Sequence, residues 1–504
     1  MSVDKDFVLS ALLQHNFFPV QSRDKDEMPP VFSSLLFTPE IARKLVRGNK
    51  RSSKDYPGYD AIDYRRTKFS GVYRNLSIPH PFAYADLSLC IHDNWHQLEY
   101  IATNKNSMIR PRRNRDGRLI IMYYKETANK PINEKTEWHL RSAFGKRFMV
   151  NTDISSFFPT IYSHAIPWAI KGLKYAKGHR ATTEWFNKFD AKLTSLKRNE
   201  TQGVAVGPGT SNIACEVILA RVDENLRDEG FVFIRAIDDY TAYCKTEDDT
   251  QRFIRRLAEE LAKFKLTLHL NKTKIMPLPQ TVNEDWITEL GIKLPKGDSL
   301  REKDALNYLD MAVRIAKMSP DGSVLKYAIK SLNGCKLVPK AKSSLLAYVL
   351  TLSFHQTALL PLLAGLFKRS MLLSSGEFKY ANPLRSLLSE NIINRRSDGM
   401  AWTLYYMDKY KVSIDNKTAD DIIETEDCIA LLLLYRLGDA ACKSKILDFA
   451  KGLDRNDLYK LDQYWLLLYQ LYHSGKIGNP YKGEDVFEIL KDNNVSFLYP
   501  KRTL

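Results

Sequence analysis

The sequence predicts an α+β domain followed by an all-α domain. From about residue 105 to residue 295, segments with the two-residue alternation of strands take turns with segments that show the 3.6-residue period of helices. Beyond Pro295, helical patterns continue almost to the C-terminus. Because 504 residues are more than one hydrophobic core normally supports, two or three domains are expected, and a hydrophobic content of 44 % excludes a wholly disordered chain.

The first strand patterns in the α+β region form a predicted hairpin. Met108 to Arg113 and Arg118 to Tyr124 flank the segment Asn114 to Gly117, in which Asp-Gly is a strong turn signal. Arg147 to Thr152 then alternates apolar and polar residues as a strand does, and it leads into Asp153.

A helix, a second hairpin and another helix follow. Ser211 to Asp228 has one apolar stripe, and Gln251 to Phe264 is amphipathic. Between these helices, the strand patterns 231–237 and 240–245 are separated only by Asp238 and Asp239. A short strand is expected at Thr267 to Leu270. This order favours an α+β sheet with helices on one face.

The last 200 residues predict stacked antiparallel helices, as in an irregular α-solenoid. Such an array usually binds, scaffolds or oligomerises, so we expect the chemistry to lie elsewhere. The clearest helical patterns are Asp304–Met318, Ser344–Phe354, Ala358–Lys368, Asp427–Leu437 and Arg455–Ser474.

One uncharged stretch is long enough to cross a bilayer. Leu345 to Phe367 runs 23 residues without a formal charge. It is interrupted by His355, Gln356 and Thr357 and again by Pro361, which favours two buried helices that meet at a turn. We therefore expect no membrane contact.

The charge balance indicates a polyanionic partner. Lys and Arg number 75 against 59 Asp and Glu, which gives a formal net charge of +16. A surplus of this size favours nucleic acid before a membrane, because phosphates neutralised by cationic side chains release their counterions. Many basic proteins bind no such partner, so charge alone leaves nucleic-acid contact open.

The cysteines and the N-terminus are typical of a cytoplasmic protein. No CxxC pair and no His-rich neighbourhood accompanies the cysteines, so neither a disulfide framework nor a zinc site is indicated. The N-terminus carries acidic residues early and lacks the basic start and clean apolar core of a signal peptide. The six cysteines are Cys90, Cys215, Cys244, Cys335, Cys428 and Cys442.

Three acids are the candidates for chemistry. An Asp-Asp pair at a hairpin turn is usually solvated, but the apolar strands around Asp238 and Asp239 place this tip against a packed sheet. Two carboxylates about 4 Å apart repel by roughly 4 kcal/mol at an effective dielectric constant near 20, so such a pair needs cations or shared protons. Asp153 ends a strand, although a helix N-cap would also explain it. Together the three carboxylates suit two Mg²⁺ ions, which can activate a 3′-hydroxyl and stabilise pyrophosphate.

These residues resemble the polymerase motifs of reverse transcriptases. Asp153-Ile-Ser-Ser-Phe-Phe resembles motif A, and Ile237-Asp238-Asp239 resembles motif C. The order and spacing of the motifs agree with the family over about 105–295. The remaining matches are Gln202-Gly203 with Gly207 to Asn212 for motif B, Asn271 to Ile275 for motif D, and Leu290-Gly291-Ile292 before the thumb.

The nearest resemblance is to the abortive-infection reverse transcriptases of bacteria and prophages. It is carried by the continuation Phe157 to His164, by the Gly-Pro-x-x-Ser-Asn form at 207–212 and by the helical C-terminal half. It implies a fingers region at 1–145, a palm at 146–298 and a HEAT-like helical domain at 299–504, assembled as homo-oligomers.

The resemblance also implies an activity. This is template-independent DNA synthesis from dNTPs, primed from a protein hydroxyl, in defence against phage. The single-stranded DNA product would then be attached covalently to the protein.

Site roles follow from the resemblance. It implies two Mg²⁺ ions, or Mn²⁺ in their place, at Asp153, Ile154, Asp238 and Asp239, with Lys272 or Lys274 protonating pyrophosphate unless these are plain surface lysines. Phe158 is the expected steric gate against a 2′-hydroxyl, or else a core residue. The other expected substrate contacts are Gln202, Gly203, Ser211, Asn212 and the hairpin arginines Arg110, Arg112, Arg113, Arg115 and Arg118, which otherwise form a solvated face.

Two departures keep other functions open. Ala236 stands two residues before Asp238, where many reverse transcriptases have Tyr or Phe to support the primer terminus, and motif B lacks the usual Ser-Pro ending. Both disfavour ordinary templated synthesis. The alternatives are a templated reverse transcriptase of the retron or intron type and a non-catalytic nucleic-acid-binding scaffold.

Overall fold

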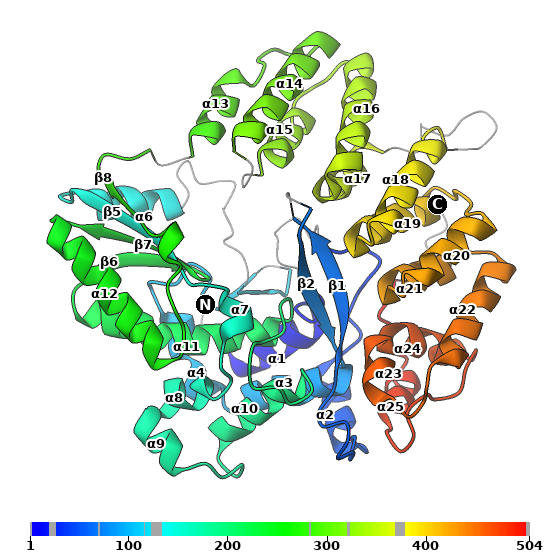
Figure 1. The fold of residues 1–504 in the computed structure, drawn as a ribbon, viewed down its shortest axis with the longest axis horizontal. Helices are drawn as coiled ribbons and strands as arrows, with labels where there is room; N and C mark the ends of the chain where they lie inside the picture. Colours follow the sequence, from blue (N-terminus) through cyan, green and yellow to red (C-terminus); the bar gives the residue numbers. More distant parts are fainter. Residues whose placement is uncertain are drawn as a thin grey trace.

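The computed structural model describes eight stretches of the chain: 3–19, 27–68, 71–114, 116–121, 134–281, 284–319, 323–367 and 378–499. Figure 1 shows the palm sheet on one side, helices α18 to α25 on the other, and the β1–β2 ribbon between them. Helices α13 to α17 lie along the top of the same view. The expected fold class, an α+β polymerase-like region followed by helices, is confirmed.

The first hundred residues form a helical base and a two-stranded ribbon. Strands β1 (Ala61–Thr67) and β2 (Tyr73–Pro79) pair antiparallel from Ala61–Pro79 to Thr67–Tyr73. The ribbon is therefore closed by a short turn that carries Gly71 at a φ of 76°. The helices around it are α1 (Lys5–Gln14), α2 (Pro39–Arg47), α3 (Pro81–Asp93), α4 (Trp95–Leu98) and α5 (Tyr100–Thr103).

The hairpin expected near residue 115 is shorter than the sequence suggested. Only β3 (Arg112–Arg113) and β4 (Leu119–Ile120) pair, and Met122 to Tyr124 lie outside the described residues. Helix α6 (Glu134–Ala143) follows.

The palm sheet has four antiparallel strands in the order β6-β7-β5-β8. They are β5 (Phe148–Asp153), β6 (Val232–Ala236), β7 (Asp239–Cys244) and β8 (Lys274–Pro277). The strand expected at Thr267 to Leu270 was misplaced: Leu268 makes a single bridge to Ile154, a 3-10 turn follows at Leu270–Lys272, and β8 then runs back along β5. Leu268 and β8 both pair antiparallel with the β5 segment, so the chain keeps its direction, and the 3-10 turn takes up the extra residues between the pairing at Ile154 and the pairing at Asn151.

Helices α11 (Gly209–Asp228) and α12 (Glu247–Lys263) cover one face of this sheet. Side chains alternate along each strand, so neighbours in sequence point to opposite faces. Phe233 of β6 packs near Phe253 of α12, and Arg235 pairs with Glu216 of α11, so these strand residues mark the helix-covered face. Asp153 and Asp239, which pair with each other, lie on the opposite face, here called the open face. The remaining palm helices are α7 (Phe157–Thr160), α8 (Ala165–Lys171), α9 (Leu173–Gly178) and α10 (Trp185–Ser195).

The C-terminal region is helical, as expected, but two of its expected helices are divided. Ala358 to Leu366 forms a 3-10 turn (η2, Thr357–Leu362) around Pro361 and then the single turn α17 (Leu363–Leu366), while Lys368 lies outside the described residues. Proline has no N–H to continue an α-helix. The helix expected at 455–474 breaks at Tyr464 into α23 (Leu458–Gln463) and α24 (Trp465–His473).

The other helices of this region pack mainly against helices close to them in sequence, such as α14 on α15, α18 on α19 and α19 on α21. Among the described residues, none of the helices is long and apolar enough to cross a bilayer, and the uncharged stretch is shared between α16, η2 and α17. These helices are α13 (Asp285–Lys293), α14 (Glu302–Met318), α15 (Val324–Asn333), α16 (Pro339–His355), α18 (Ala381–Ile393), α19 (Ser397–Lys409), α20 (Asn416–Glu424), α21 (Cys428–Leu437), α22 (Ala440–Gly452) and α25 (Val486–Asp492).

The two ends of the chain share a core. The ring of Phe17 stacks on that of Phe497 at 5.6 Å, and Trp465 donates from Nε1 to the carbonyl of Ile78 at 3.3 Å. Arg51, itself buried, pairs with Asp462 at 2.7 Å. The N-terminal region therefore packs directly on the C-terminal helices.

Candidate active site

Strand pairing brings the three acids together. Asp153 is the last residue of β5, and it lies directly opposite Asp239, the first residue of β7. Facing residues in an antiparallel pair have Cβ atoms about 4.5–5.5 Å apart. Asp238 occupies the turn between β6 and β7, and its carbonyl accepts a hydrogen bond from the backbone N–H of Ile154 at 3.3 Å. Residues 85 positions apart in sequence thus meet at one edge of the open face.

The three acids lie close enough together to change the pKa of one of them. Asp153 is buried, Asp238 is half-buried and Asp239 is exposed. Burial, followed by the nearby carboxylates of Asp153 and Asp239, raises the pKa of Asp238 from 3.8 to about 6. Positive charge at this edge would therefore be stabilising.

Lys272 supplies part of that charge. Its ammonium donates to Oδ2 of Asp153 at 2.5 Å, and this hydrogen bond raises the pKa of Lys272. The lysine side chain is 60 % exposed, so it can leave the carboxylate without unpacking anything. The 3-10 turn that carries Lys272 is held to the end of β5 by the bond from the N–H of His269 to the carbonyl of Asp153, at 2.7 Å.

The chemistry of the donor set fits a hard divalent cation. Oδ1 of Asp153 is buried and has no hydrogen-bond partner within the described stretches, and carboxylate oxygen is the ligand that Mg²⁺ prefers. The side chain of Ile154 is apolar, so that residue can contribute only its backbone carbonyl. In the described part of the chain no three His, Cys, Asp or Glu side chains are already gathered as a metal cluster.

The expected gate residue is accessible on one side. Phe158 lies in α7, is half-buried, and packs edge-on against Phe157 with ring centroids 5.5 Å apart. Its carbonyl accepts from the N–H of Val204 at 3.0 Å. The motif B loop is thus fastened to the segment that follows Asp153.

The motif B residues differ in exposure. Gln202 is exposed and donates from its amide to the carbonyl of Thr160, and the N–H of Gly203 donates to Ile161 at 2.7 Å. Gly203 has a φ of 81°, and a Cβ there would meet the carbonyl of Pro159 at 3.0 Å, so glycine is needed for this approach. Ser211 and Asn212 are buried in the first turn of α11, where they have little surface to offer a substrate.

The hairpin arginines separate into two groups. Arg110 and Arg112 line a cavity of about 130 Å³ together with Trp138 and Ile234. Ile234 points to the open face, because it alternates with Arg235. Arg113 instead pairs with Asp4 at 3.2 Å and lies over the ring of Phe7, Arg118 pairs with Asp116 at 3.6 Å, and Arg115 lies outside the described residues.

Sequence reasoning missed the β1–β2 ribbon as part of the site. The charge of Arg74, on β2, acts on Asp238 and opposes the rise of its pKa. Burial and the neighbouring cations Arg74, Lys272 and Arg66 lower the pKa of Lys68, beside the ribbon turn. Cations therefore gather next to the carboxylates. In the sequence, the ribbon could have been found from the two alternating segments on either side of Gly71, each of which carries basic residues.

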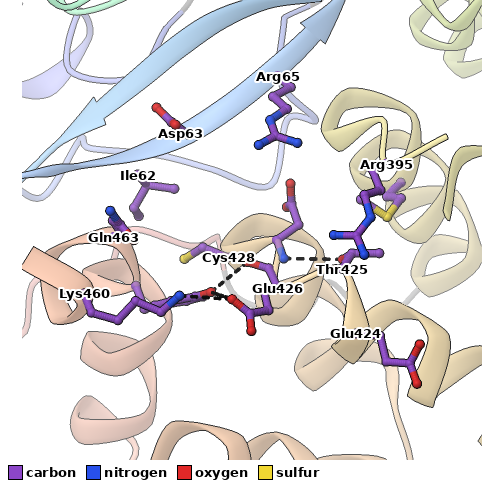
Figure 2. A pocket seen from close by; sticks show the side chains of 13 residues that line it. Ile62, Asp63, Arg65, Arg395, Glu424, Thr425, Glu426, Cys428, Lys460 and Gln463 are labelled. Atoms are coloured by element: carbon purple, nitrogen blue, oxygen red, sulfur yellow. Dashed lines mark hydrogen bonds and ion pairs between the residues drawn. The ribbon is translucent and has the colours of Figure 1, made fainter. Parts of the chain in front are cut away.

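A larger cavity, of about 470 Å³, lies between β1 and residues of helices α19, α20, α21 and α23. Figure 2 shows Arg65 on the ribbon side of this cavity, and Lys460 and Glu426 together on the helical side, where they pair at 3.0 Å. Acidic and basic side chains alternate around its wall, so the lining selects no particular charged ligand.

Comparison with known families agrees with this geometry. Residues 94–310 match the family described as "Reverse transcriptase (RNA-dependent DNA polymerase)", and all three acids lie within the match. The chain therefore contains a reverse transcriptase domain, which indicates a DNA nucleotidyltransferase.

Solved structures show a low overall likeness to telomerases. Apo telomerase from Candida tropicalis has 11 % identity and a TM-score of 0.34, over 82 % of this chain and 73 % of that one. A form truncated from its C-terminal domain has 12 % identity and a TM-score of 0.31, over 48 % of this chain and 54 % of that one. Telomerase from Candida albicans, in complex with the TWJ fragment of telomeric RNA, has 10 % identity and a TM-score of 0.28, over 82 % and 70 %. No curated protein matches the chain.

Proposed function

We propose that this chain polymerises deoxynucleotides at the edge of the open face, with divalent cations bound by Asp153, Asp238 and Asp239. The main support is that Asp153 pairs with Asp239 next to the turn that carries Asp238, inside a reverse transcriptase domain. The carbonyl of Ile154 is a further donor. Mg²⁺, or Mn²⁺ in its place, would supply the charge that activates a 3′-hydroxyl and stabilises the departing pyrophosphate.

The residues around the acids have separate tasks in this proposal. Lys272 holds a proton beside Asp153 and can pass it to the leaving pyrophosphate, since a positioned acid typically contributes about 10²–10⁴-fold. Phe158 closes the space below the sugar and so selects deoxynucleotides. Gln202 and Gly203 shape the loop beside it.

A clamp for the triphosphate is supported by the cations of the ribbon. Lys68 and Arg74 stand near Lys272 and Asp238, and their mutual repulsion would be relieved by a polyanion. Arg110 and Arg112 are candidates for the same role from the cavity they line on the open face. Guanidinium groups bind phosphate oxygens in pairs.

We further propose template-independent synthesis primed from a hydroxyl of the protein, in phage defence in the cytoplasm and by a homo-oligomer. The support is the resemblance carried by Phe157 to His164 and by 207–212, together with Ala236 in place of an aromatic primer support. Nucleotides are the substrates that the family implies. A covalently attached DNA strand would be the product.

One experiment separates these proposals from their alternatives. The full-length protein is incubated with labelled dNTPs and Mg²⁺ without added template, and the products are separated by denaturing electrophoresis with and without protease. Label that migrates with the protein until protease is added supports protein-primed synthesis. Incorporation only with a homopolymer template supports the templated alternative. No incorporation under either condition, with Mg²⁺ or Mn²⁺, would remove the enzyme assignment.

A further inference from the structure

Arg235 is a buried cation on the helix-covered face of the palm sheet. Its side chain is fully buried, as are its partners Glu216 and Asp223 on α11, at 2.8 Å each. A buried guanidinium is stable only when its charge is paired and its donors are satisfied. This cluster lies on the far side of the sheet from the open face, so it touches no substrate.

All three nitrogens of the guanidinium donate hydrogen bonds, which together reach two carboxylates and one backbone carbonyl. Nε donates to Asp223, and Nη2 donates to Glu216 and forms an ion pair with Asp223 at 2.8 Å. Nη1 donates to Glu216 at 2.8 Å and to the backbone carbonyl of Ile237, also at 2.8 Å. The last of these bonds reaches beyond the ion cluster to the turn that carries Asp238.

The turn needs such support. Ile237 has a φ of 62°, in the left-handed region that β-branched residues rarely adopt. Conformations of this kind persist only where the surroundings hold them. The carbonyl that Arg235 binds belongs to the peptide group shared with Asp238, so the guanidinium fixes the orientation of that peptide.

Other bonds extend the same cluster to neighbouring elements. Asp223 accepts from the hydroxyl of Tyr240 at 3.0 Å and from the amide of Asn104 at 2.7 Å. The backbone of Arg235 pairs with the segment before the hairpin arginines, through Asn106 at 2.7 Å and Met108 at 2.8 Å. These bonds therefore hold the turn in place against α11, β7 and the segment Asn106 to Met108.

We infer that Arg235 is a positioning residue that holds the turn at Ile237 and so places Asp238 for divalent-cation binding. This inference rests on the proposed function. Lysine cannot replace it, because an ammonium has three donors on one atom and cannot span two carboxylates and a carbonyl in a plane.

The test compares Arg235→Lys with Arg51→Lys. Arg51 is a matched control: it is also buried, it also pairs with two acids, Asp462 at 2.7 Å and Glu484 at 2.9 Å, and it lies between other elements. Both variants should unfold at lower temperature. Only Arg235→Lys should speed amide hydrogen exchange at 237–239. It should also raise the Mg²⁺ concentration for half-maximal incorporation by about tenfold, since misplacement of reacting groups by 1 Å is worth about 10²-fold.

Mn²⁺ gives a second readout, because Mg²⁺ demands the more regular geometry. We expect Mn²⁺ to restore more activity to Arg235→Lys than to Arg51→Lys. The inference is overturned if folded Arg235→Lys keeps wild-type exchange at the turn and the wild-type Mg²⁺ requirement, or if Arg51→Lys raises that requirement equally. Inactive wild-type protein would count against the proposed function alone, because the exchange measurement still tests Arg235.

A second variant covers failure of the first to fold. Glu216→Gln removes one charge, while its amide oxygen can still accept from Nη1. A smaller rise in exchange and in Mg²⁺ requirement supports the inference, and a folded variant without either change overturns it.

Discussion

Lys272 donates a hydrogen bond to Asp153 across the end of the palm sheet, at 2.5 Å between Nζ and Oδ2. The lysine comes from the turn before β8 and the acid from the end of β5. The ammonium of Lys272 therefore balances the negative charge of Asp153 at the open face. Because the lysine side chain is largely exposed, it can also exchange its proton with solvent. This pair can be tested by itself.

Replacement of Lys272 by Ala should slow incorporation by about 10²–10⁴-fold, because a positioned proton donor is lost. It should also lower the Mg²⁺ concentration needed for half-maximal rate, because Asp153 loses a competing cation. Initial rates over a Mg²⁺ series measure both. Lys274→Ala is the control, since Lys274 is exposed on β8 and pairs in register with Asn151. Equal effects of the two changes would contradict the assignment.

Asp238→Asn should abolish incorporation and stabilise the protein without metal. The pKa of this carboxyl is raised from 3.8 to about 6, so its ionised form destabilises the folded state above about pH 6, and the effect is absent below about pH 4. At pH 7 the gain is about 1–3 kcal/mol. Thermal unfolding at pH 4 and pH 7 measures it. A variant that is less stable than wild type at pH 7 would contradict the prediction.

Changes at the ribbon should act on nucleotide affinity. Lys68→Ala and Arg74→Ala should each raise KM for dNTP by about tenfold and change kcat less, because they remove charges facing the triphosphate. The effect should shrink at high salt, which screens exposed charges. Lys417→Ala, an exposed lysine of α20, is the control. A fall in kcat at unchanged KM would place these cations in another role.

Phe158→Ala should admit ribonucleotides. The ring lies half-buried in α7, and in the proposed role its removal leaves room for a 2′-hydroxyl. We expect the ratio of kcat/KM for dNTP over rNTP to fall by at least about tenfold, which corresponds to about 1.4 kcal/mol. Phe144→Ala, at a ring that is 90 % exposed, is the control. An unchanged ratio would identify Phe158 as a packing residue.

Thr67→Val should weaken the packing of the β1–β2 ribbon against helix α19. The backbone N–H and hydroxyl of Thr67 both donate to the buried carboxylate of Asp398, at 2.9 and 2.8 Å. Burial raises the pKa of Asp398, so losing one donor should destabilise the protein by about 1–3 kcal/mol. KM for dNTP should rise although residue 67 does not face the acids. Denaturant unfolding and steady-state kinetics test the two parts separately.

Local patterns were enough to predict the acids and the elements that carry them. The Asp238–Asp239 tip is flanked by apolar strands, and Asp153 ends a strand, so each position follows from its own neighbours. Arg235 was not predictable, because its partners lie on a helix 12 and 19 residues earlier and an arginine in a strand is normally exposed. Tyr464, where the expected helix breaks, donates from its hydroxyl to the carbonyl of Glu426, a contact that no local pattern encodes.

The stacking of Phe17 on Phe497 has a consequence for synthesis of the chain. Chains are synthesised from the N-terminal side at about 5–20 residues per second, so Phe17 must wait for Phe497 before that shared core can close. The ribbon that leans on the last helices waits with it. The N-terminal packing described here can therefore be completed only after residue 497 has been synthesised, and a chain cut short before that residue would lack this shared core.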